Sequence, residues 1–188
     1  WRNVYSSEDT RKIINKAKSK TKSKSLYQKV VAKKFLTEIN GALNYPVPKN
    51  FEFKHDLFLM QRHLAYMMST VPFFGNFSGT GAGKTISAIL STRGEKSKIC
   101  MIVCPNNVIG TWKKEIESVV PKCKVITGSE AFNAREERVP QYLVINYDKL
   151  NQFDTYEQIK KLSKLNIDYI ILDEIHWAKT FSDDNVSK

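Results

Sequence analysis

Two periodicities of apolar residues alternate along most of this chain. Short, nearly continuous apolar runs rich in Ile, Val and Tyr predict buried strands. They are "FFGNF" (73–77), "KICMIVC" (98–104), "CKVIT" (123–127), "YLVIN" (142–146) and "DYIILD" (168–173). Patterns of helical spacing lie between several of them, at 56–70, 84–92, 107–120 and 156–165. Strands that alternate with helices predict an α/β fold, in which a parallel sheet is sandwiched by helices.

The N-terminal part has a different pattern. Residues 27–43 have apolar positions at helical spacing, and Gly41, Pro46 and Pro48 end the predicted helix. The stretch "NYPVPKN" is typical of a linker. We therefore predict a helical extension with its linker at 1–50 and an α/β domain at 51–188.

Charge separates the same two parts. The net charge is +11, and residues 1–50 hold 12 Lys and Arg against 3 Asp and Glu, a surplus of 9. Such a basic segment suits contact with a polyanion. The alternative for the run "KAKSKTKSKS" is a solvated basic helix or a disordered arm.

Composition limits the class of protein. Hydrophobic residues make up 41% of the 188 residues, which is ordinary for a globular domain. No run approaches the roughly 18 apolar residues of a membrane span, and the polar start has neither a signal-peptide core nor an initiator Met. We therefore expect a piece of a longer protein that does not enter a membrane.

The cysteines indicate a reducing compartment. Cys100 and Cys104 flank an apolar run and are predicted to be buried free thiols, and Cys123 leaves the total odd. The three histidines show no zinc-ligand spacing relative to them. The expected location is the cytoplasm of a prokaryote or a virus-infected cell, or the nucleus of a eukaryote.

The stretch "FSGTGAGKT" carries the strongest chemical signal. Gly79, Gly81 and Gly83 allow successive backbone N–H groups to surround an anion, and the predicted helix from Lys84 adds its positive N-terminal end. Lys84 would reach the β- and γ-phosphates of a nucleotide, and the Thr85 hydroxyl would bind Mg²⁺. The predicted nucleotide-binding residues are Ser78, Gly79, Thr80, Gly81, Ala82, Gly83, Lys84 and Thr85.

This loop departs from the strict G-x-x-x-x-G-K-[ST] pattern at one position. Ser78 stands where the pattern has its first glycine. The plain alternative is a glycine-rich turn that happens to precede Lys-Thr.

A second signal is the acidic end of "YIILDEIHWAK". A buried strand that ends in two carboxylates is costly unless they serve a cation and a water molecule. Asp173 would then hold Mg²⁺, and Glu174 would orient or deprotonate the attacking water. The alternative is a strand end with solvated carboxylates.

Together these segments resemble superfamily-two helicases. "SGTGAGKT" is similar to their phosphate loop, and Asp173-Glu174-Ile175-His176 is similar to their D-E-x-H box. "IVCPNNVIGTWKKEIE" (102–117) and "YLVINYDKL" (142–150) resemble the SWI/SNF-type DNA translocases, and "LFLMQRHLAYMM" resembles their entry helix.

The resemblance implies a first RecA-like, helicase ATP-binding lobe that uses ATP and Mg²⁺. It implies that Lys84 and Glu174 are catalytic, that Gln61 reads adenine, and that His176 couples the nucleotide site to a second RecA-like lobe. Loop residues implied to contact the nucleic-acid backbone are Asn106, Asn107, Tyr147 and Lys149.

In the entry helix, Met60 stands where the family has Tyr, so only Gln61 carries over. The sequence also departs from the family pattern at Ile175, Trp177 and Thr180, which puts the groove contact after the D-E-x-H box in doubt. Trp112 is expected to be a core anchor rather than a platform for base stacking.

The implied function is movement on double-stranded DNA, coupled to ATP hydrolysis by the full-length protein. The arginine that stabilises the transferred phosphate would come from the second lobe, so we expect these 188 residues alone to bind nucleotide but hydrolyse it very slowly. The alternatives are the motor subunit of a restriction system, an RNA helicase of the same superfamily, or a nucleic-acid-binding module without catalysis.

Overall fold

The computed structural model describes residues 7–79, 81–92, 98–150 and 155–181. The chain divides into two compact units. The first, here the helical unit, is Trp1–Lys49 with Phe53–Glu95, and the second, here the sheet unit, is Asn50–Glu52 with Lys96–Lys188. The predicted domains, 1–50 and 51–188, stay a prediction, because such units are defined by contacts and not by independent folding.

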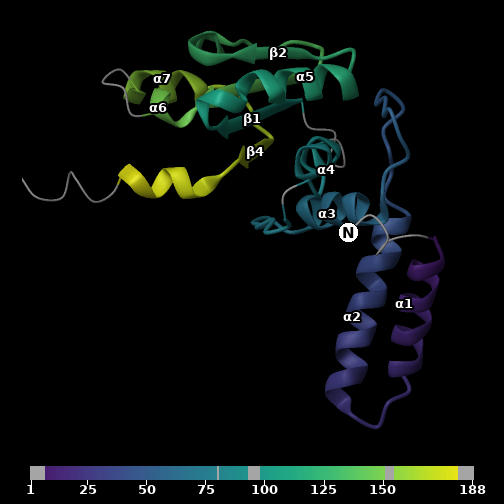
Figure 1. Ribbon diagram of the computed structural model, residues 1–188. Coiled ribbons are helices and arrows are strands. Elements are labelled where there is room, and N and C mark those ends of the chain that lie inside the picture. Colours follow the sequence, from purple (N-terminus) through teal and green to yellow (C-terminus); the bar gives the residue numbers. More distant parts are fainter. Residues whose placement is uncertain (1–6, 80, 93–97, 151–154, 182–188) are drawn as a thin grey trace, which may run out of the picture. The chain divides into compact units, whose positions relative to one another are not determined.

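The helical unit contains four helices in the described residues. They are α1 (Ser7–Lys20), α2 (Leu26–Leu43), α3 (Leu59–Thr70) and α4 (Lys84–Ser91). Helices α1 and α2 form an antiparallel hairpin (Figure 1), α2 also packs on α3, and α3 packs on α4. Gly41 permits the contact of α2 with α3, because a Cβ atom there would lie 2.3 Å from Cζ of Tyr66. The predicted helices at 27–43, 56–70 and 84–92 are confirmed, with small differences at their ends.

The strand predicted at 73–77 is wrong. Residues 74–79 have no regular secondary structure, and Phe73 and Phe77 are 94% and 95% exposed. The side-chain oxygen Oδ1 of Asn76 accepts hydrogen bonds from both the backbone N and the Oγ of Ser78. Such local side-chain bonds favour a turn over a strand ladder, and Gly75 weakens the strand further.

The sheet unit contains a four-stranded parallel sheet in the order β2-β3-β1-β4. Its strands are β1 (Ile99–Cys104), β2 (Lys124–Thr127), β3 (Gln141–Asn146) and β4 (Tyr169–Leu172). All four match the positions of predicted runs, and the α/β parallel-sheet fold class is confirmed. The prediction that every strand is buried is wrong for β2 and β4, which contain no buried residue. Because the strands are parallel, their carboxyl ends meet at one edge of the sheet, where ligands bind in such folds.

Helical segments flank this sheet (Figure 1). The helix α5 (Ile109–Val119) packs against β2 and β3. A core cluster on one sheet face joins strand residues such as Leu143 and Ile145 to Phe132 of the 3₁₀ helix η2 (Gly128–Asn133) and Leu162 of α7 (Thr155–Leu162). A short helix, α6 (Tyr147–Leu150), follows β3, and two further 3₁₀ helices are η1 (Asn106–Val108) and η3 (Ile175–Phe181).

The central strands are buried almost completely. All six residues of β3 and five of the six in β1 are buried, as expected of strands covered on both faces. Cys100 and Cys104 are buried free thiols, which confirms their prediction, whereas Cys123 is only partly buried. None of the described helices has both the length and the apolar character needed to span a bilayer.

Candidate nucleotide site

The predicted phosphate loop closes around its own lysine. Gly81 and Gly83 both have a φ of 76°, a left-handed conformation that glycine adopts without strain. Gly83 is the N-cap of α4, so Lys84 is the first residue of that helix. The ammonium Nζ of Lys84 donates a hydrogen bond of 3.0 Å to the carbonyl oxygen of Ser78. The positive charge is thereby held between the start and the end of the loop.

Gln61, the predicted adenine-reading residue, lies against this loop. It is 7% exposed on α3, and its Oε1 accepts a 3.0 Å hydrogen bond from the backbone N of Phe58. A Cβ atom at Gly83 would lie 2.3 Å from Nε2 of Gln61. The φ angle therefore favours glycine at position 83, and a side chain there would also displace the amide of Gln61.

The remaining loop residues are partly placed. Ser78, Ala82 and Thr85 are half-buried, and Gly79 is exposed, with no atom within 4 Å of a Cβ built there. Thr80 lies outside the described residues. Their nucleotide-binding roles stay predictions.

The sheet unit holds the predicted acidic residues at the end of β4. The backbone N of Asp173 donates to the carbonyl oxygen of Val103 on β1 at 2.8 Å, which continues the ladder to the strand end. The indole Nε1 of Trp112 donates a 2.9 Å hydrogen bond to Oδ2 of Asp173. The hydroxyl of Tyr147 donates to the backbone oxygen of Asp173 at 2.9 Å. Three elements (β1, α5 and α6) therefore fix the position of this residue.

These contacts assign Trp112 a second role besides packing. The side chain is 3% exposed, as expected for a core anchor, yet its polar edge points to the carboxylate. Sequence reasoning did not find this bond, because 61 positions separate the two residues. A signal was present in the chemistry, since a buried Trp N–H usually has a hydrogen-bond partner.

Asp173 also affects neighbouring acids. Burial first, and then the negative charge of Asp173, raise the pKa of the Cys104 thiol to about 12. Burial and the same carboxylate are the two largest causes that raise the pKa of Tyr147 to about 12. Both groups are therefore neutral at physiological pH, and the Tyr147 hydroxyl keeps the proton that it donates.

Glu174 has an unusual backbone. Its φ of 52° lies in the left-handed region, which is uncommon for residues other than glycine and concentrates at functional sites. Its side chain is half exposed, with Oε2 3.3 Å from Nδ1 of His176. Glu174 is thus directed to solvent beside a histidine, a position from which a carboxylate can hold a water molecule. The predicted catalytic and coupling roles of these residues stay predictions.

Polar side chains follow the two central strands at the same sheet edge. Asn146, at the end of β3, donates from Nδ2 to Oδ1 of Asn106 in η1 at 3.1 Å. Its own Oδ1 accepts from the backbone N of Lys149 at 3.3 Å. Asn107 is exposed, whereas Tyr147 is 5% exposed. Sequence reasoning missed Asn146, and the nucleic-acid contacts predicted for its neighbours stay predictions.

The predicted site residues thus form two groups. Gln61 and the phosphate loop belong to the helical unit, and Asp173, Glu174 and His176 belong to the sheet unit. Each group is ordered by its own hydrogen bonds. Their convergence on one nucleotide stays a prediction.

The donors present fit Mg²⁺ as part of a nucleotide complex. The described residues contain no group of three or more His, Cys, Asp and Glu that could hold a metal. Mg²⁺ in nucleotide enzymes typically has one or two carboxylates and completes its shell with phosphate and water. Asp173 suits this role, because its Oδ2 is bonded to Trp112 and its Oδ1 accepts no hydrogen bond from the described residues. Thr85, the other predicted ligand, lies at the start of α4 in the helical unit, and its metal-binding role stays a prediction.

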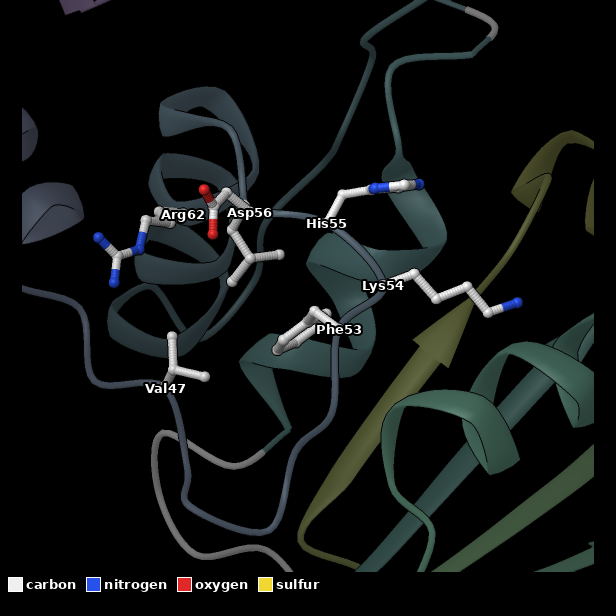
Figure 2. A pocket seen from close by; sticks show the side chains of 7 residues that line it. Val47, Phe53, Lys54, His55, Asp56 and Arg62 are labelled. Carbon is white, nitrogen blue, oxygen red and sulfur yellow. The ribbon is translucent and has the colours of Figure 1, made fainter.

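A separate pocket of about 760 Å³ lies beside α3 in the helical unit. Figure 2 shows Lys54 and His55 extending to one side of it and Arg62 to the other. It is lined by Val47, Phe53, Lys54, His55, Asp56, Leu57 and Arg62. None of the described residues predicted to bind nucleotide lines it, so it is not the predicted phosphate site.

A glycine loop with its lysine at a helix N-terminus, and a parallel strand ending in Asp-Glu, are features of P-loop α/β domains, although residues 74–79 before this loop form no strand. Residues 76–185, more than half of the chain, match the sequence model of the family described as "Type III restriction enzyme, res subunit". The chain belongs to this family, and it is a helicase-type ATPase domain with a RecA-like fold. The prediction of a superfamily-two helicase lobe is confirmed.

Among solved structures, the chain is similar to the "Sulfolobus solfataricus SWI2/SNF2 ATPase core in complex with dsDNA". The two are 16% identical, with a TM-score of 0.49 over 69% of this chain. The chain spans about a third (34%) of that protein. No curated protein matches this sequence.

Proposed function

We propose that this chain is the ATP-binding lobe of a motor that couples ATP hydrolysis to movement on double-stranded DNA. The observation that carries the proposal is the closed loop, in which Lys84 Nζ bonds to the Ser78 carbonyl oxygen in a chain of a helicase-type family. An ammonium held there has a carbonyl partner that a phosphate oxygen can replace with a stronger, charge-assisted bond.

The residues of the helical unit would bind the nucleotide. Lys84 would neutralise charge on the β- and γ-phosphates, and loop N–H groups at the start of α4 would surround the phosphate oxygens. Gln61 would read the adenine edge with its Nε2, while its Oε1, already bonded to the Phe58 amide, can accept one more hydrogen bond.

The residues of the sheet unit would serve the reaction. Asp173, together with Thr85 of the helical unit, would hold Mg²⁺, which would supply positive charge to the phosphates. Glu174 would orient or deprotonate the water that attacks, and His176 would respond to closure by a second lobe. Trp112 would keep the Asp173 carboxylate in one orientation through its bond to Oδ2.

A nucleotide-binding experiment tests the proposal. Binding of a fluorescent ATP analogue with Mg²⁺ should weaken at least tenfold in Lys84→Ala, because the loop loses its charge. Lys122→Ala, an exposed lysine of the sheet unit, is the matched control and should bind like the parent. Equal affinity of Lys84→Ala and the parent would contradict the nucleotide site. Nucleotide binding in the parent with negligible turnover is the result expected of the isolated 188 residues.

The nucleic acid is tested with the full-length protein. Its ATPase activity should rise with double-stranded DNA and rise less with single-stranded DNA or double-stranded RNA. Stimulation by RNA alone would favour the RNA-helicase alternative. Lys84→Ala that keeps the full cellular function would favour a binding module without catalysis.

A second candidate is the motor subunit of a restriction system, favoured by the description of the matching family. DNA cleavage that requires both ATP and the full-length protein would support this candidate. DNA movement without cleavage would support a translocase of the remodeller type.

A further inference from the structure

The positive charge of the chain is concentrated on the α1–α2 hairpin. Residues 11–34, here the basic hairpin, hold ten Lys and Arg and no Asp or Glu, a charge of +10. The net charge of the whole chain is +11, so the other 164 residues contribute only +1. The segment covers most of α1, the connecting turn and the first half of α2.

These cations face solvent. Nine of the ten are exposed, and Lys29 is partly buried. The ion pair that the structure describes among them joins Lys12 Nζ to Glu8 Oε1 at 2.9 Å. Like charges one helical turn apart, as in Lys16 and Lys20, destabilise a helix, so this distribution does not serve the stability of the hairpin.

The turn between the helices is ordered by its neutral residues. The hydroxyls of Ser19 and Thr21 donate to backbone carbonyls of the preceding helical turn at 2.8 and 2.7 Å. Ser23 Oγ donates to Gln28 Oε1 at 2.8 Å, and Ser25 caps α2. The serines and threonine of "KAKSKTKSKS" therefore hold the backbone, and the lysine side chains between them stay available for a ligand.

The base of the hairpin is anchored. Ile39 and Ala42, near the end of α2, are 4% and 0% exposed, and α2 packs there on α3. Glu38 Oε2 lies 3.6 Å from Nε2 of His63 on α3. Figure 1 shows the two helices as a projecting pair, with the turn at the end opposite to α3. The cations are thus presented on a preorganised element, which lowers the entropy that binding costs.

We propose that the basic hairpin is a second, sequence-independent contact for the phosphate backbone of the nucleic acid on which this motor acts. The proposal rests on the proposed function, which supplies the nucleic acid. Lys12, Lys16 and Lys20 lie one turn apart along α1 and form a row of charges about 12 Å long. Lysine is a point charge that binds phosphates without reading bases.

An anionic membrane is the other polyanion to consider. Four apolar residues at the start of α2 are exposed: Leu26, Tyr27, Val30 and Val31. A helix that binds a membrane surface separates its apolar face from its charged face. Here Lys34 lies one turn beyond Val30 and Val31 and interrupts the apolar stripe. The observations therefore favour nucleic acid over a membrane.

The test compares two triple variants with the same net charge. The hairpin variant is Lys16→Gln, Lys20→Gln and Lys24→Gln, and the control is Lys122→Gln, Lys161→Gln and Lys164→Gln. All six lysines are exposed, and each triple changes the net charge from +11 to +8, since 11 − 3 = 8. Binding to a short labelled DNA duplex and to its single strand is measured without nucleotide over a series of salt concentrations.

The hairpin variant should bind at least about tenfold more weakly than the parent at low salt, with the slope of log affinity against log salt reduced by up to about 2.7. The affinity of the control variant should stay within about twofold of the parent affinity, and its salt dependence should have the parent slope. Circular dichroism checks that both variants keep the parent helix content. Comparison of duplex with single strand identifies the form of nucleic acid that the hairpin prefers.

Three results would overturn the proposal. The first is an equal loss of affinity for DNA in the two triple variants. The second is that the parent binds neither nucleic acid. The third is that the parent binds phosphatidylserine vesicles more tightly than DNA at equal phosphate and salt. Because nucleotide is absent, failure here is separate from failure of the ATP site, which the Lys84→Ala experiment detects.

Discussion

The bond between Trp112 and Asp173 allows a sharp test of how this acidic strand end is organised. Trp112→Phe removes the indole N–H and keeps an aromatic ring, whereas Asp173→Ala removes the acceptor. A hydrogen bond to a charged group contributes about 1.5–3 kcal/mol. Asp173 is partly exposed, and water can replace part of this bond. We therefore expect a coupling free energy near the lower limit, about 1.5 kcal/mol.

The assay is a double-mutant cycle on the free energy of unfolding. This free energy is measured by urea denaturation, with circular dichroism as the probe of unfolding. Trp112→Phe also leaves a small cavity, but that cost occurs with and without Asp173 and cancels in the cycle. The matched control pairs Tyr147→Phe with Asp173→Ala. The Tyr147 hydroxyl donates to the backbone oxygen of Asp173, which the alanine variant retains, so this pair should be additive.

A coupling below about 0.5 kcal/mol between Trp112 and Asp173 would refute the reasoning, because that is the additivity expected of independent sites. A second measurement separates positioning from stability. Trp112→Phe should raise the Mg²⁺ concentration needed for half-maximal nucleotide binding and leave binding without Mg²⁺ unchanged. Equal loss in both conditions would indicate a purely structural role.

Two further predictions follow from the geometry. Gly83→Ala should lower the free energy of unfolding by about 1–2 kcal/mol, because alanine is strained at this left-handed φ. A Cβ atom at Gly79 meets no other atom, so Gly79→Ala should cost less than about 1 kcal/mol. Equal losses of stability in the two variants, measured by urea denaturation, would contradict this. Stability should also decline between pH 9 and pH 12, since the Cys104 pKa rises from 9.0 to about 12 on folding and the folded state holds that proton more tightly. The free energy of unfolding of Cys104→Ala should decline less than that of the parent between pH 9 and pH 12. Identical pH profiles of stability would argue against a buried, protonated thiol.

Much of this protein follows from its sequence. Period and length of the apolar runs predict the four strands of the sheet, and the central strands β1 and β3 are buried on both faces, which requires continuous apolar residues. The sequence also indicates the phosphate loop and the Asp-Glu pair, since their chemistry depends on neighbours in the chain, and their roles stay predictions. The order of these segments led to the family that the sequence match confirms. Local signals were misleading at 73–77, where side-chain hydrogen bonds of Asn76 to Ser78 accompany irregular backbone in place of the predicted strand.

Tertiary structure decided the contacts that orient the functional groups. The bonds from Trp112 to Asp173 and from Asn146 to Asn106 join residues far apart in sequence, and both depend on parallel strands that end at one sheet edge. The contact of Gln61 with Gly83 depends on how α3 packs on α4. Sequence periodicity specifies which face of an element is buried, but partners across elements depend on the packing of the whole unit. The sequence alone therefore indicates the residue types and local loops, whereas the hydrogen-bond partners of Asp173 required the tertiary structure.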